Sequence, residues 1–113
     1  MNVSIIIPVY NEEKSVINTI SQIDKIMSKA NYNFEIIVVD DGSEDNTSSL
    51  LSNCQFEINL ISKKSNQGYG AALKTGIQKA NNDIICITDA DGTYPNEKLS
   101  IFVQQLIEQD LDM

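Results

Sequence analysis

Two aspartates stand one residue apart near the end of the chain, in the stretch ITDADGTYP at residues 87–95. Carboxylates so close together on an irregular loop are suited to a divalent cation, because hard cations prefer oxygen ligands. The alternative is an Asx-turn pair, which is the commoner fate of an isolated Asp-x-Asp-Gly. An EF-hand does not fit, because DADGTYPNEKLS lacks the other oxygen ligands of that loop. Taken alone, this stretch leaves both interpretations of Asp89 and Asp91 open, a metal site and an Asx-turn pair.

Three more polar stretches follow apolar runs: PVYNEE, DDGSEDNT and KKSNQGYG. Alone, Asp40 and Asp41 before a glycine can be a strand-ending turn with a helix cap. The pair Gly68-x-Gly70 is a poor dinucleotide fingerprint, because Leu73 stands where the third glycine is needed. The glycines instead allow a tight turn or a close approach of the backbone to a ligand.

The composition limits the classes of function. The 113 residues form one domain at most, and 42% hydrophobic with 21% charged residues is ordinary for a globular protein. Sixteen acidic against 8 basic residues, a net charge of −8, argue against nucleic acid or anionic lipid as a non-specific partner. Two cysteines are too few for a disulfide scaffold, and we expect Cys86 to be a buried thiol in a reduced, cytoplasmic protein. The N-terminus has no basic leader or cleavage site, and no run is long enough for a membrane span.

Short apolar runs that could position these polar stretches recur along the chain. Each consists of consecutive apolar residues, many of them β-branched, and does not alternate with polar ones, which predicts parallel strands buried on both faces. The first run is expected to end at Pro8, which cannot donate to a sheet ladder. The predicted strands are VSIIIPV, EIIVVD, INLIS and DIICITD.

Helical patterns lie between these runs. Asn11 is the expected cap of the first helix, with Glu12 and Glu13 in its first turn. A short helix after DDGSED should bury Leu50 and Leu51. The third runs from about Gly70 to Ala80 and a fourth starts near Asn96. The apolar positions expected inward are Val16, Ile17, Ile20, Ile23, Ile26 and Met27 in the first helix, Ala72, Leu73, Ile77 and Ala80 in the third, and Leu99, Phe102, Val103, Leu106 and Ile107 in the fourth.

The resulting order, βαβαβαβα, predicts an α/β fold with a doubly wound, mostly parallel sheet in the strand order 3-2-1-4. In such sheets ligands bind beyond the carboxyl ends of the strands, which is where all four polar stretches fall. Gly76, in the middle of the third helix, costs about 1 kcal/mol relative to alanine, so we expect it to approach the sheet closely.

Taken together, the motifs SIIIPVYNEE, IIVVDDGSEDNT, NQGYGAALKTGIQKA and DIICITDADGTYP resemble the family 2 glycosyltransferases of GT-A fold. The match is collinear over residues 3–97 and leans toward the polyprenyl-phosphate sugar transferases, such as those that resemble dolichyl-phosphate mannose synthase. The residues Gly92-Thr93-Tyr94 differ from the form associated with mannosyl transfer. The resemblance therefore implies a nucleotide-sugar donor, but leaves the sugar and the acceptor open.

The resemblance also implies roles for individual residues. It places Pro8, Tyr10 and Glu12 around the base and ribose, and either Asp40 or Asp41 against the base edge.

At the fourth motif, DIICITDADGTYP, the resemblance implies Mg²⁺ or Mn²⁺, which would offset repulsion between the acidic chain and the diphosphate of UDP or GDP. Asp91 is the first choice of ligand, and Asp89 either helps directly or holds the ribose or a metal-bound water.

The leading hypothesis is a metal-dependent transferase that inverts the sugar configuration, with residues 1–113 as its nucleotide-binding part and the acceptor half outside this chain. A sugar hydroxyl acceptor would need a general base from that half, whereas a lipid phosphate would need none. The alternatives are a non-catalytic nucleotide-binding module and a dehydrogenase that binds NAD without metal. Any membrane association would come from regions outside this chain.

The run DIICIT also predicts a partner. It would lie at a margin of the sheet within residues 1–113, although the half outside this chain should cover it in a longer protein. Ile84, Ile85, Cys86 and Ile87 carry no charge or proline that would block pairing with another chain. We therefore expect a homo-oligomer formed through residues 84–88.

Overall fold

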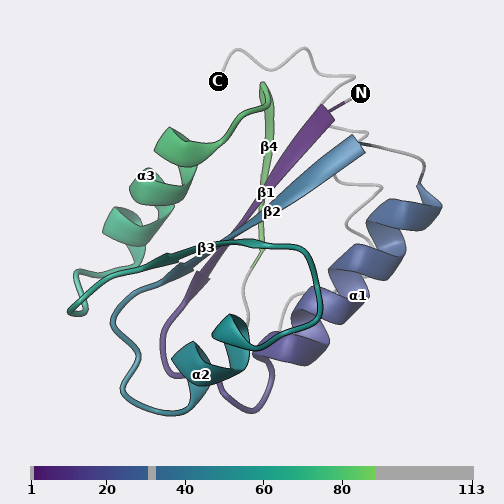
Figure 1. The fold of residues 1–113 in the computed structure, drawn as a ribbon. Coiled ribbons are helices and arrows are strands. Elements are labelled where there is room, and N and C mark those ends of the chain that lie inside the picture. Colours follow the sequence, from purple (N-terminus) through teal and green to yellow (C-terminus); the bar gives the residue numbers. More distant parts are fainter. Residues whose placement is uncertain (1, 31–32, 89–113) are drawn as a thin grey trace.

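The computed structural model describes residues 2–30 and 33–88, and in them four strands form one sheet with helices on both faces (Figure 1). The helix expected from about Asn96 lies outside the described residues. Up to that point, the predicted alternation of strands and helices is confirmed. The elements are β1 (Asn2–Val9), α1 (Val16–Lys29), β2 (Asn33–Asp40), α2 (Thr47–Ser52), β3 (Asn59–Ser62), α3 (Tyr69–Lys79) and β4 (Ile84–Ile87).

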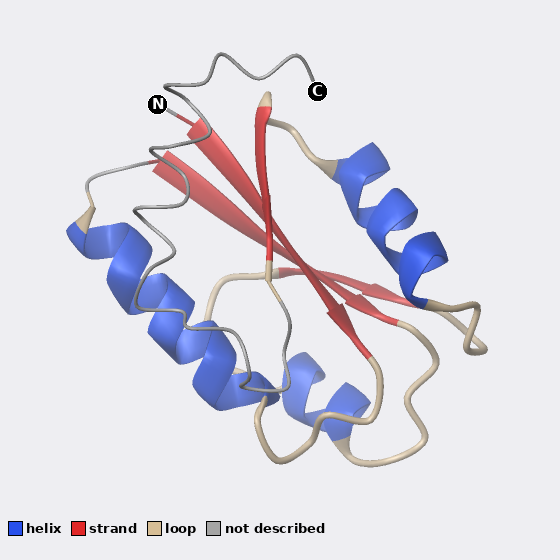
Figure 2. Ribbon diagram, turned by 180° about the vertical axis from the view of Figure 1, so that it is seen from behind, coloured by secondary structure: helices blue, strands red, loops and turns tan. Residues whose placement is uncertain are grey.

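The strands lie in the order β3-β2-β1-β4, as predicted, and each neighbouring pair is parallel. From β1 through β2 to β3 the chain moves in one direction across the sheet, and then returns past β1 to β4. Because such crossovers are right-handed, α1 and α2 cover one face and α3 the other (Figures 1 and 2). The arrangement confirms a doubly wound α/β fold.

The core lies on both faces of the two central strands. Under α1 and α2 a large cluster includes Ile5, Ile7, Val38 and Cys86, and under α3 a smaller one centres on Ile6, Ile37, Val39 and Ala72. β3 and β4 are only partly buried, so burial of every strand on both faces was a wrong expectation. Each has a single neighbouring strand among the described residues, which leaves its outer side less covered.

Pro8 does not end β1, contrary to the sequence prediction, because the strand continues to Val9. The reason lies in the pairing with β4. Its ladder with β1 stops at Ile6 and Ile87, and Thr88 closes it by donating its N–H to the Ile6 carbonyl oxygen at 3.1 Å. In this parallel pattern the next donor on β1 would be residue 8. Proline is accommodated at that position, because the ladder has already ended.

Two apolar side chains that were expected to be inward are exposed. Leu51 is buried in the short helix α2, but Leu50 is 37% exposed. In α3 the residues against the sheet are Ala72 and Gly76, while Ile77 is 43% exposed. With 3.6 residues per turn, a neighbouring residue points about 100° away from the buried one, and a narrow contact cannot cover both.

Gly76 approaches the sheet closely, as predicted. A Cβ built there would lie 2.5 Å from Cγ2 of Ile6 and 3.3 Å from Cγ2 of Val39. Both neighbours are buried side chains of the central strands, so they have little room to move. The glycine sets the distance between α3 and the sheet.

Cys86 is fully buried in β4, and Cys54 is half-buried; both are free thiols. Burial raises the pKa of the Cys86 thiol to about 12. Since the thiolate is the reactive form, this cysteine is an inert core residue near neutral pH, as expected.

Candidate functional site

The turns after β1, β2 and β3 meet at the carboxyl edge of the sheet. We call residues 10–15, 41–46 and 63–68 the first, second and third rim loops. Figure 1 shows the arrowheads of β1 and β2 leading into the loops before α1 and α2. Hydrogen bonds join the first loop to the second and the second to the third, so three segments distant in sequence form one surface.

Asn11 joins the first two rim loops. Its backbone N–H donates to the Ser43 hydroxyl at 2.9 Å, and its side-chain oxygen accepts the N–H groups of Glu44 at 2.8 Å and Asp45 at 3.4 Å. Its φ of 53° lies in the left-handed region, which asparagine tolerates better than most residues. Asn11 therefore does not cap α1, which begins five residues later at Val16. The predicted helix start is wrong because the side chain binds the second loop.

A second set of hydrogen bonds joins the first rim loop to the end of the second rim loop and the start of α2. The backbone N–H of Glu12 donates to the Thr47 hydroxyl at 2.9 Å, and that of Glu13 to the Asp45 carboxylate at 3.4 Å. Asp45 also accepts the Thr47 N–H at 2.9 Å. Desolvation raises the pKa of Asp45, but the hydrogen bonds from Thr47 and Glu13 outweigh it and hold that pKa below its ordinary value. The backbone of Glu12 is thus fixed against α2.

Asp40 and Asp41 are both buried, and their carboxylates serve different loops. Asp40 accepts the Ser43 N–H at 3.1 Å and the hydroxyl of Ser48, so it shapes its own turn. Asp41 accepts the N–H groups of Gln67 and Gly68 in the third loop.

The remaining predicted nucleotide-binding residues also lie at this edge. Tyr10 is 40% exposed at the end of β1, so its ring is available to a ligand. Pro8, two residues earlier in the chain, is buried within β1. Sequence reasoning brought Tyr10, Glu12, Asp40 and Asp41 to one rim, and the structure places them there.

Asp89 and Asp91 lie outside the described residues. Thr88, the last described residue before them, donates its backbone N–H to the Ile6 carbonyl oxygen of β1. Within residues 2–30 and 33–88, there is no group of three or more acidic, histidine or cysteine side chains arranged to hold a metal.

Sequence reasoning missed the linking role of Asn11, Gln67 and Gly68. A signal for Asn11 existed, because an asparagine directly after a strand often adopts a left-handed conformation. For Gln67 no signal existed, because its backbone N–H makes the contact, and that group is the same in every residue except proline.

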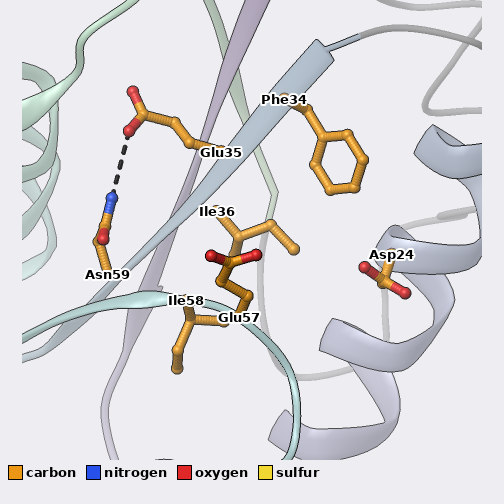
Figure 3. Close-up of a pocket in the computed structure, with 7 residues that line it drawn as sticks. All are labelled: Asp24, Phe34, Glu35, Ile36, Glu57, Ile58 and Asn59. Atoms are coloured by element: carbon orange, nitrogen blue, oxygen red, sulfur yellow. Dashed lines mark hydrogen bonds between the residues drawn. The ribbon is translucent and has the colours of Figure 1, made fainter.

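A separate hollow of about 310 Å³ opens at the opposite edge of the sheet, between α1 and the starts of β2 and β3 (Figure 3). Asp24 and Glu57 lie beside it, over an apolar floor that includes Ile36, whereas the Glu35 side chain points away toward Asn59. Three side chains donate to the Glu35 carboxylate, Ser4 at 2.5 Å, Asn81 at 3.0 Å and Asn59 at 3.2 Å. The hollow lies away from the rim loops and was not predicted.

None of the helices among the described residues has the length and apolar character needed to cross a membrane.

Comparison with known proteins adds to this geometry. The family described as "Glycosyl transferase family 2" matches residues 4–113. An undecaprenyl-phosphate 4-deoxy-4-formamido-L-arabinose transferase of Pseudomonas fluorescens is 36% identical over 107 residues, which cover 91% of this chain and 31% of that protein. The chain thus spans about a third of this curated relative.

Solved structures of other proteins have a similar fold. A mannosyltransferase from Pyrobaculum calidifontis, in complex with GDP-Man and Mn²⁺, has 28% identity and a TM-score of 0.68 over 92% of this chain and 32% of its own. The mannosyl-3-phosphoglycerate synthase of Rubrobacter xylanophilus has a TM-score of 0.79 over 95% of this chain and 36% of its own. At 23% identity, that second likeness concerns the fold alone. Because the family profile and these folds both match almost the whole chain, we conclude that the chain belongs to glycosyl transferase family 2.

Proposed function

We propose that this chain forms the nucleotide-binding part of an enzyme that transfers a sugar from a nucleoside-diphosphate sugar to an acceptor, with inversion at the sugar. The observation that carries the proposal is the rim, where three loops meet at the carboxyl edge of a parallel sheet. This edge is where doubly wound folds bind their ligands. The complex of the mannosyltransferase from Pyrobaculum calidifontis with GDP-Man supports the choice of donor.

At the rim, Tyr10 offers an exposed ring on which a base can stack. Pro8 and Glu12 flank it along the chain and would border the base and the ribose. We assign base discrimination to Asp40, because its turn joins the first rim loop through Ser43 and Asn11.

A divalent cation, Mg²⁺ or Mn²⁺, fits this chain by the chemistry of the available donors. Asp40 and Asp41 at the rim already accept hydrogen bonds from backbone N–H groups. Asp89 and Asp91 are then the residues that would hold the cation, since they follow the end of β4 and carry the hard oxygen ligands that it prefers. Such a cation would supply charge stabilisation for the leaving diphosphate.

For the acceptor we propose a polyprenyl phosphate. Support comes from the Pseudomonas fluorescens relative, whose name specifies undecaprenyl phosphate. A phosphate oxygen is already ionised at neutral pH, so this acceptor needs no general base.

Calorimetric titration of the chain with UDP and with GDP, in Mn²⁺ and again in EDTA, tests the donor and the metal. We expect binding that depends on Mn²⁺, and its loss in Asp91→Asn without a change in the circular dichroism spectrum. Unchanged nucleotide affinity in Asp91→Asn would remove the metal assignment. Asp40→Ala should weaken one nucleotide more than the other, and equal losses would argue against base reading.

The second candidate is a nucleotide-binding module without catalysis, favoured by the fact that the chain spans only about a third of its relative. A turnover assay with a panel of nucleotide sugars and undecaprenyl phosphate, read by mass spectrometry, separates the two. Binding without product under every donor would favour the module.

A further inference from the structure

The third rim loop is fastened to the turn after β2 at both of its ends. At its start, the Lys63 backbone N–H donates to the Asp40 carbonyl oxygen at 2.9 Å. At its end, the N–H groups of Gln67 and Gly68 donate to the two carboxylate oxygens of Asp41, at 3.0 and 2.9 Å. One side chain therefore holds two successive residues directly before α3.

Between these ends the loop lies flat against Gly42. A Cβ at that glycine would come within 2.5 Å of the Ser65 carbonyl carbon and 2.7 Å of the Asn66 nitrogen. Gly42 also has a φ of +77°, a conformation that other residues rarely adopt. Backbone packs on backbone here, so the loop cannot shift toward the turn, and the Asp41 bonds keep it from moving away.

The chemistry of the contact requires a carboxylate. Both groups that face the Asp41 oxygens are N–H donors, and an ionised carboxylate is a side chain that accepts on both oxygens. Asp41 is only 4% exposed, so water cannot readily replace a missing acceptor. An asparagine would turn its own N–H₂ group toward one of the two donors and lose that bond.

The loop has a further internal support. The Lys63 ammonium donates to the Gln67 side-chain oxygen at 3.0 Å and to the Ala71 carbonyl oxygen at 3.4 Å. Lys63 thus ties the loop to the first turn of α3. Moving the end of the loop would move the start of that helix with it.

We propose that Asp41 is a positioning residue for the nucleotide site: it sets the third rim loop and the start of α3 against the turn after β2. The proposal rests on the proposed function, and it divides the aspartate pair. Asp40 discriminates between bases, whereas Asp41 holds the surface on which any nucleotide binds. Loss of the Asp41 carboxylate lowers affinity for UDP and GDP by the same factor.

The test compares Asp41→Asn with the unchanged chain by two measurements. The first is amide hydrogen exchange of Gln67 and Gly68 without nucleotide. We expect exchange at Gln67 to be faster by about tenfold or more, since a charge-assisted bond is lost. The change at Gly68 should be smaller, because its N–H also donates to the Asn66 side-chain oxygen at 2.9 Å. The second is calorimetric affinity for UDP and for GDP in Mn²⁺, where we expect an equal loss of about tenfold for both. Unchanged exchange at both amides, or a loss confined to one base, would overturn the proposal.

Gly42→Ala provides a variant that leaves the carboxylate intact. Its methyl group would push residues 65 and 66 off the turn, so it should reproduce the faster exchange and the equal loss of affinity. Agreement between the two variants would also answer the objection that Asp41→Asn merely fails to fold. If Gly42→Ala folds and changes neither measurement, the positioning role is wrong.

Glu35→Gln is the matched control, because Glu35 also accepts a backbone N–H, that of Asn81 at 2.7 Å, but at the opposite edge of the sheet. It should lower the melting temperature and leave both nucleotide affinities unchanged. If it lowers them as much as Asp41→Asn does, the effect is one of general stability and the proposal fails. If the unchanged chain binds no nucleotide, the proposed function fails, while the exchange measurement still decides whether Asp41 holds the loop.

Discussion

At the scale of single residues, the two glycines of α3 differ in the space around them. Gly76 lies against Ile6, and a side chain has no room there. Gly70 lies in the same helix, yet a Cβ built on it would meet no heavy atom within 4 Å. The packing of the described residues therefore explains the first glycine and not the second.

Gly76→Ala should lower the free energy of unfolding by up to about 2 kcal/mol. Overpacking against Ile6 costs about 1–3 kcal/mol, and the better helix propensity of alanine returns about 1 kcal/mol at most. Chemical denaturation monitored by circular dichroism measures the difference. Gly70→Ala is the control, and it should not be destabilised; if both variants lose the same stability, contact with Ile6 is not the cause.

At the scale of elements, Glu35 connects four segments at the amino edge of the sheet. From β2 it accepts the Ser4 hydroxyl of β1, the Asn59 amide of β3, and both the backbone N–H and the side-chain amide of Asn81 in the turn before β4. Desolvation raises the pKa of Glu35, but the hydrogen bonds from Ser4, Asn81 and Asn59 outweigh it and hold that pKa below its ordinary value of 4.5. The charged carboxylate is the form that the fold favours.

Glu35→Gln should therefore destabilise the chain at neutral pH, by about 1 kcal/mol because the site is partly open to solvent. A carboxyl whose pKa is lowered by folding stabilises the fold above its unfolded pKa, and this contribution is lost as the pH falls through the folded pKa. The difference in melting temperature between the two proteins should thus be constant near pH 7 and shrink below about pH 4.5. A difference that grows on acidification would contradict this account.

At the scale of the whole molecule, the outer side of β4 has no neighbouring strand among the described residues. Thr88 donates its N–H to the Ile6 carbonyl oxygen of β1. Because backbone N–H groups alternate in direction along a strand, the N–H of Cys86 also points toward β1. The N–H groups of Ile85 and Ile87 then point away from β1, toward the margin of the sheet. We predict that a second copy pairs there, through residues 84–88, in antiparallel orientation.

Ile85→Pro tests this pairing without touching the ladder to β1. It removes a donor on the outer side, so we expect a folded monomer where the unchanged chain is a dimer by light scattering. Cys86→Pro removes a donor that faces β1 and should unfold the chain. A monomeric unchanged chain at high concentration would show that this edge is not an interface.

Much of the architecture followed from local sequence pattern. Runs of consecutive isoleucine and valine predicted parallel strands, and the strand order expected of a doubly wound fold, 3-2-1-4, is confirmed by the structure. The meeting of the rim loops followed from the same order, because the carboxyl ends of parallel strands share an edge. Gly76 was predictable too, since a glycine in mid-helix needs a reason and close packing is the commonest.

What only the tertiary structure decided concerns partners that are distant in sequence. Asn11 resembles a helix cap by its neighbours, but the second rim loop takes its side chain, and α1 starts later as a result. Leu50 and Ile77 match a buried periodicity, but the contact available to each helix is narrower than the pattern. The sequence placed Asp41 beside the nucleotide, but not its contacts with backbone N–H groups 26 and 27 positions away. Backbone donors are nearly identical along any chain, so a sequence predicts where a carboxylate lies but only the fold determines which donor reaches it.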